Sequence, residues 1–172
     1  MPVRHHVPEE VRGRPFSPTR EPGVLTPQQV RGRSYSRILR GAYWAPQGEF
    51  HHGVKVRAAL AVLPPEVVVA GRSAMWFWGA KVAAAADPVE VILQPPHHVR
   101  NRPEILVHRC ALRDDEWQEV PTGQVTTPVR TAFDVGRTGD PLVTVPLLDA
   151  LMAATGVTVE EVARLRRSRP GA

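Results

Sequence analysis

Short apolar runs rich in β-branched residues stand out in the middle of the chain and predict strands. Residues 89–93 and 105–108 predict two strands separated by a loop that contains prolines and Asn101. Residues 67–69 predict another short, buried strand, and 117–120 and 123–126 extend the sheet around a turn.

Helical spacing of apolar residues appears before and after these strands. Residues 51–63 predict a helix that Pro64 and Pro65 end, and 71–79 predict a short buried helix capped by Ser73. Three more helices are predicted toward the C-terminus, over 127–137, 141–154 and 158–167, the last begun by a capping box between Thr158 and Glu161. We therefore expect a mixed α+β fold with a small, mostly antiparallel sheet and helices packed on it.

The N-terminal part has a weaker pattern. Residues 1–23 contain five prolines among arginines and glutamates, which predicts a disordered basic tail. Thr26 and Pro27 predict a helix start, and 34–40 predict a second short helix. The expected organisation is a tail (1–23), a short helix-turn-helix-like segment (24–46), an α/β domain (47–168) and a second tail (169–172).

The net charge of +5 is unevenly distributed. Residues 1–44 carry +5, residues 45–163 carry −4, and the remaining C-terminal residues carry +4. Basic ends are typical of proteins that contact nucleic acid, and equally of solvated tails in an arginine-rich chain. On the predicted second helix Arg33, Arg37 and Arg40 share one face, so they are the candidate nucleic-acid-binding residues.

Other features argue against a membrane protein, a metal site or an enzyme. Cys110 is the only cysteine, and no apolar run reaches the ~20 residues that span a bilayer, so we expect a cytoplasmic protein. Three histidine doublets, His5-His6, His51-His52 and His97-His98, lack partners at zinc-like spacing. We interpret the acidic run 114–116 as a solvated turn. The aromatic run 76–78 is assigned to the core in preference to base stacking. We expect no catalytic residues, metal or cofactor.

Arg130 and Asp134 lie one helical turn apart in a segment that Thr127 caps. A pair at this spacing contributes only a few tenths of a kcal/mol by itself, about 0.2 to 0.5. We therefore predict a structural, largely buried network in which Arg130 binds a carboxylate of another element, such as Asp149, or sheet carbonyls. Arg72 is assigned to the same polar network.

Several short blocks resemble the AbiEi-type antitoxin family of actinobacteria, in the same order and at similar spacing. These blocks are Gly41-Ala42-Tyr43, Gly71-Arg72-Ser73-Ala74, 88–93, 106–109, 125–134 and Leu148-Asp149. The resemblance implies a type IV antitoxin with an N-terminal winged-helix DNA-binding unit. Such a protein represses its own operon and counters a nucleotidyltransferase-like toxin.

The resemblance leaves more than one function open. A complete winged helix needs about three helices and a hairpin, whereas the positions from Pro27 to Leu39 can hold only two very short helices. One interpretation is a non-enzymatic antitoxin-like regulator that contacts DNA, a cognate toxin, or both. Another is the accessory region of an endonuclease. In many relatives, this region is followed by a nuclease domain similar to the very-short-patch-repair enzymes. A third is a remnant that binds only a partner protein.

Overall fold

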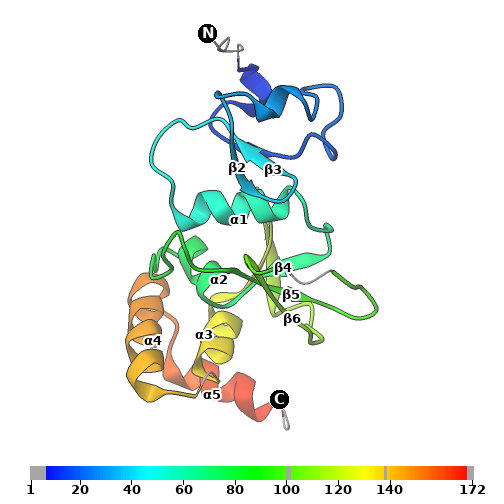
Figure 1. Ribbon diagram of the computed structural model, residues 1–172. Helices are drawn as coiled ribbons and strands as arrows, with labels where there is room; N and C mark the ends of the chain where they lie inside the picture. The colour runs from blue at the N-terminus through cyan, green and yellow to red at the C-terminus, as the bar shows by residue number, and fades with distance from the viewer. Residues whose placement is uncertain (1–6, 100–101, 138, 170–172) are drawn as a thin grey trace.

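The computed structural model describes residues 7–99, 102–137 and 139–169, so His5 and His6 lie outside the described residues. The described chain forms two sheets with helix α1 (His52–Leu60) between them, and further helices beside the larger sheet (Figure 1). The predicted mixed α+β fold is confirmed.

The first sheet is built by the N-terminal residues. It contains three antiparallel strands in the order β1-β3-β2, accompanied by two 3₁₀ turns; the elements are η1 (Glu9–Val11), β1 (Pro15–Phe16), η2 (Gln29–Arg31), β2 (Ser36–Leu39) and β3 (Ala42–Trp44). Val11 and Phe16 are buried with Leu25, Val30 and Tyr35. Residues 7–23 are therefore not a loose tail, because their few apolar side chains belong to a small core.

The predicted helix over 34–40 is wrong, since this segment forms strand β2. Gly41 turns the chain back with a positive φ of 89°, a conformation that suits glycine. The resulting hairpin pairs β2 with β3 and buries Leu39 and Ala42 against α1. Strand pairing and burial have overridden the local preference. Residues 24–46 thus hold a 3₁₀ turn and a hairpin in place of a helix-turn-helix.

The second sheet contains the five strands that the sequence predicts. They are β4 (Val67–Val69), β5 (Val89–Leu93), β6 (Ile105–His108), β7 (Trp117–Val120) and β8 (Gly123–Thr126), in the order β6-β5-β4-β8-β7. Two pairings are antiparallel, β4–β5 and β7–β8, and two are parallel, β4–β8 and β5–β6. This sheet is therefore mixed and not mostly antiparallel, because the long connection after β5 returns the chain to the end where β5 began.

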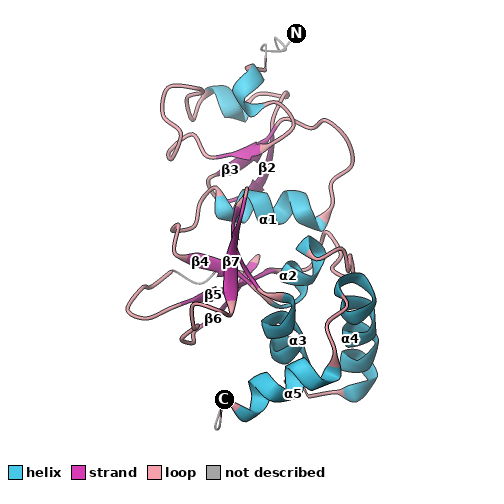
Figure 2. Ribbon diagram, turned by 180° about the vertical axis from the view of Figure 1, so that it is seen from behind, coloured by secondary structure: helices cyan, strands magenta, loops and turns pink. Residues whose placement is uncertain are grey.

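The predicted helices around this sheet are also present. They are α1, α2 (Gly71–Phe77), α3 (Pro128–Gly136), α4 (Pro141–Thr155) and α5 (Val159–Arg167), and Figure 2 shows α3 and α4 side by side with α5 crossing below them. The capping box of Thr158 and Glu161 is confirmed. Ser73 is not the cap of α2, which begins after Ala70; its hydroxyl accepts the Glu90 backbone N–H instead.

No single helix in the described ranges is long and apolar enough to cross a membrane. Helices α4 and α5 meet the length and composition requirements only as a pair, which is bent by 111°.

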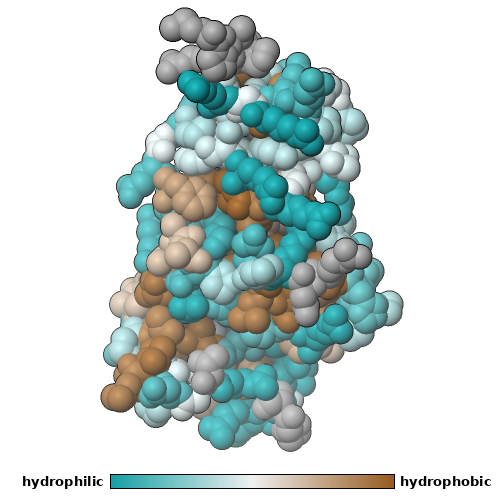
Figure 3. Space-filling view, viewed as in Figure 1, coloured by the Kyte–Doolittle hydropathy of each residue, from teal (hydrophilic) through white to brown (hydrophobic). Residues whose placement is uncertain are grey.

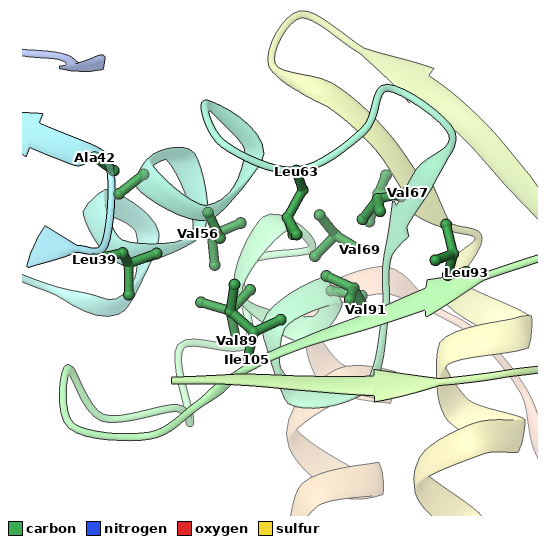
Figure 4. Close-up of a cluster of buried hydrophobic side chains, with 14 residues drawn as sticks. Leu39, Ala42, Val56, Leu63, Val67, Val69, Val89, Val91, Leu93 and Ile105 are labelled. Atoms are coloured by element: carbon green, nitrogen blue, oxygen red, sulfur yellow. The ribbon is translucent and has the colours of Figure 1, made fainter. Parts of the chain in front are cut away.

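The two faces of the large sheet have different surroundings. Strand alternation turns Val67, Val69, Val89, Val91 and Leu93 toward α1, where they form the main core with Leu39 and Ala42 (Figure 4). The opposite face carries Glu90 and Ile92 of β5 and Leu106 and His108 of β6. Helices α3 and α4 lie on this second side.

Candidate functional site

A cavity of about 830 Å³ lies between the second sheet face and helices α3 and α4. Its polar and charged lining comes from β5, α2, α3, β6 and the residues that directly follow α3 and β6, and it includes Arg72, Glu90, His108, Arg109, Asp134 and Arg137. Its apolar lining includes Ile92, Leu106, Val143 and Leu147. A cavity of this size with convergent polar groups has the character of a ligand site.

Glu90 is the anionic centre of one side of the cavity. Its Oε1 accepts a hydrogen bond from Arg72 Nε at 3.1 Å, and its Oε2 lies 3.5 Å from His108 Nε2. Burial raises the pKa of the Glu90 carboxyl, but hydrogen bonds from His108 and Arg72 outweigh it and hold the pKa below its ordinary value. The hydrogen bond between Glu90 and His108 also raises the pKa of His108. The site therefore favours a charged His108 and an ionised Glu90.

Gly71 allows this arrangement by its lack of a side chain. It has a positive φ of 52°, and a Cβ at this position would collide with the Glu90 carboxylate. Arg72, the next residue, also pairs with Asp87 at 3.5 Å. The start of α2 is thus fitted closely around Glu90.

Arg130 is the centre of a second, buried network. Only 1% of it is exposed, and its Nε and Nη1 donate to Asp134 Oδ2 at 2.9 Å and to Glu116 Oε2 at 2.8 Å. Its Nη2 lies 3.3 Å from Cys110 Sγ. Arg130 is therefore buried in a polar network, as predicted, and Glu116 is the carboxylate from another element.

Two residues assigned to this network have other positions. Asp149 is exposed on α4, so the carboxylate predicted from the sequence is the wrong one, and Arg72 belongs to the Glu90 cluster. Asp134 connects the two clusters, because it binds Arg130 and also lines the cavity. Burial outweighs the effect of Arg130 and raises the pKa of Asp134.

Glu116 is the residue whose role the sequence did not reveal. Asp114 and Asp115 are exposed, as expected of a solvated turn, whereas Glu116 is only 2% exposed. It also accepts hydrogen bonds from Arg169, including one from Nε at 2.5 Å. Arg169 is therefore not part of a loose tail. No local pattern marks Glu116, because its partners are distant in sequence.

Glu90 and His108 were also not predicted as site residues, although a signal was present. Each is a polar residue within an otherwise apolar strand. Alternation places both on the face away from the core, and the parallel pairing of β5 with β6 brings them together.

The candidate nucleic-acid-binding residues are all exposed, but they do not share a helix face. Arg37 lies in the edge strand β2, Arg33 precedes this strand, and Arg40 lies at the hairpin turn. Arg102 adds a further cation here, since its Nη1 donates to the Arg40 carbonyl at 3.2 Å. The basic surface is therefore present in a form different from the one predicted.

The remaining histidine and aromatic candidates are either packed in the structure or exposed at its surface. His52 is buried, which lowers its pKa, and its ring lies 2.8 Å from Ser73 Oγ and 3.1 Å from the Ala84 carbonyl. His97 and His98 are exposed. Phe77 and Trp78 pack against the core, and Trp76 stacks on His51. The residues that the structure describes contain no group of three His, Cys, Asp or Glu side chains placed to hold a metal.

Comparisons with known proteins establish the fold and not a family. No protein-family model matches the sequence, and no curated protein matches it. The crystal structure of the RV2827C protein from Mycobacterium tuberculosis is similar, with a TM-score of 0.55 and 17% identity. The alignment covers 83% of this chain and 59% of that chain, so this chain spans less than two thirds of that protein's length.

Proposed function

We propose that the protein is a non-enzymatic, cytoplasmic regulator of the antitoxin type, which contacts DNA through its N-terminal part. The observation that supports DNA contact is the charge of residues 24–46. This segment holds Arg31, Arg33, Arg37 and Arg40, all exposed, and no acidic residue. Because phosphate neutralisation dominates non-specific affinity, such a surface favours a polyanionic partner.

The shape of the segment decides which kind of contact is expected. Arg37 and Arg40 project from a short edge strand and a hairpin turn, and no α-helix is present in residues 24–46 to enter a major groove. The arginines are therefore suited to contact phosphates, which position a protein on DNA without reading base sequence. We propose salt-sensitive binding with little sequence preference from this surface.

Fluorescence anisotropy with a labelled duplex, measured over a range of salt concentrations, tests this proposal. The triple variant Arg33→Ala, Arg37→Ala, Arg40→Ala should reduce the slope of log affinity against log salt by about 0.9 for each phosphate that these arginines neutralise in the parent protein. The matched control is Arg164→Ala, Arg166→Ala, Arg167→Ala, which removes the same charge from exposed residues of α5. Equal affinity and slope in the folded N-terminal variant and the parent would refute the assignment.

The proposed protein partner is a nucleotidyltransferase-like toxin, and its support is the resemblance to the AbiEi-type family. If a neighbouring reading frame encodes such an enzyme, its product should form a complex with this protein and lose toxicity on co-expression. Unrelieved toxicity and separate elution of the two proteins would count against this half of the proposal. The purified protein should also leave duplex DNA intact in the presence of magnesium.

A further inference from the structure

We propose that the cavity between the second sheet face and helices α3 and α4 binds a small organic anion, meaning a carboxylate or phosphate group attached to an apolar body. This site is separate from the basic N-terminal surface and extends the function beyond DNA contact. Three properties of the cavity support the proposal: its unpaired cations, its apolar wall and its volume.

The cavity lining contains more cationic side chains than its two carboxylates pair with. Glu90 is paired with Arg72, and Asp134 is paired with Arg130. Arg109 and Arg137 line the same cavity and are exposed, and neither forms an ion pair with any residue in the described part of the chain. The planar donor fork of a guanidinium matches carboxylate and phosphate oxygens. The unpaired charge of the site is therefore positive.

The cavity also has apolar lining residues that are partly open to solvent. Leu106 of β6 is 46% exposed and Val143 of α4 is 58% exposed, and Leu147 lies one helical turn beyond Val143. Apolar surface also runs along α4 in the space-filling view (Figure 3). A ligand with an apolar body would cover this wall and remove its side chains from water, which is favourable in proportion to the area buried.

The volume of the cavity distinguishes such a ligand from a simple ion. At about 830 Å³ it falls within the range of small-molecule sites, about 300 to 1,000 Å³. Glu90 and Asp134 repel an anion, so the acid group should lie closest to the cations that pair with neither of them. The expected orientation directs the acid group to Arg109 and Arg137 and the apolar body to Leu106, Val143 and Leu147.

Calorimetric titration of the full chain with four probes tests this inference. Octanoate and octyl phosphate contain both parts of the expected ligand, octan-1-ol contains only the apolar part, and inorganic phosphate contains only the anion. We expect saturable binding of at least one of the two octyl anions, and binding of octanol and inorganic phosphate that is at least tenfold weaker. The preferred octyl anion identifies the acid group as carboxylate or phosphate.

Two variants locate the binding. Arg137→Gln removes a cation, and Val143→Asp places a negative charge on the apolar wall; both residues are exposed, so the fold should tolerate the changes. Arg137→Gln should weaken binding by about tenfold, as expected for the loss of one charge-assisted contact. Val143→Asp should also weaken binding by about tenfold, because its carboxylate repels the anion and needs water where the apolar body would lie. Arg164→Gln, which removes an exposed arginine outside the cavity lining, should leave the affinity unchanged.

The inference is overturned if neither octyl anion binds, if octanol binds as tightly as they do, or if both cavity variants retain the parent affinity. The triple N-terminal alanine variant separates this inference from the proposed DNA contact. It should lose DNA affinity and retain binding of the octyl anion, so failure of one proposal leaves the other testable.

Discussion

Arg130 shows, at the scale of single residues, how a buried charge is accommodated in this fold. Its guanidinium is held by Asp134 on its own helix, by Glu116 before β7, and by the sulfur of Cys110. Glu116 in turn binds Arg169, which follows α5. A buried ion is tolerated when its hydrogen-bonding groups are satisfied in this way, and removing one partner leaves an uncompensated charge.

Glu116→Ala should therefore lower the free energy of unfolding by about 3 to 5 kcal/mol, because it leaves Arg130 buried without its main partner from another element. The measurement is urea denaturation followed by circular dichroism. Asp115→Ala is the matched control, since Asp115 is exposed and its loss should change stability by less than about 0.5 kcal/mol. Similar effects of the two substitutions would show that the network contributes little.

At the scale of elements, the close approach of α1 and α2 depends on one glycine. Gly53 lies in the first turn of α1, and a Cβ added there would fall within the Trp76 ring of α2. Trp76 is itself stacked on His51, with ring centroids 5.2 Å apart. The ring is therefore held between the two helices and has little freedom to move aside.

Gly53→Ala should destabilise the protein by about 1 to 3 kcal/mol through overpacking, although alanine is the better helix former. Gly136→Ala is the comparison, because Gly136 is also helical and an added Cβ would meet nothing nearer than Leu148 at 3.9 Å. This second change should be neutral or stabilising, by up to about 1 kcal/mol. Thermal unfolding of both variants is the measurement, and stabilisation by Gly53→Ala would contradict the packing of Trp76.

At the scale of the whole molecule, the N-terminal hairpin contributes side chains to the core of the large sheet, beside the small core of its own. Leu39 and Ala42 of the N-terminal hairpin belong to the same buried cluster as Val56 of α1 and the strands β4 and β5 (Figure 4). The basic N-terminal part is therefore not an independent unit attached by a linker. Its stability depends on the core that the large sheet also uses.

Leu39→Ala should accordingly loosen both sheets together. Leu39 is 1% exposed, and its truncation should cost about 2 to 5 kcal/mol. Hydrogen exchange of amides in β3 and β5 is the measurement, and both strands should lose protection. Leu142→Ala, a truncation of a leucine that is 87% exposed, should leave exchange unchanged. Loss of protection in β3 alone would mean that the two sheets unfold separately.

The sequence by itself determined the elements whose signals are local. Thr127 with Pro128 and the capping box of Thr158 mark the starts of α3 and α5, because a cap and the N–H groups that it satisfies are three residues apart or fewer. Short β-branched runs identified β4, β5 and β6, and the turn at 121–123 identified β7 and β8, because these signals also lie within a few neighbouring residues. The buried position of Arg130 was also predictable. An isolated Arg–Asp ion pair at helical spacing contributes only a few tenths of a kcal/mol, so further partners for Arg130 were expected.

The tertiary structure decided everything that depends on partners far apart in the chain. Residues 34–40 became a strand because pairing with β3 and burial of Leu39 outweigh local helix preference. Glu116 became the partner of Arg130, and Glu90 met His108, only once the strands were ordered. The cavity likewise exists because α3 and α4 cover the second sheet face incompletely. Such features depend on the free energy of contacts between residues far apart in the chain. A short stretch of sequence contains only one of the two partners of each contact, so it cannot reveal them.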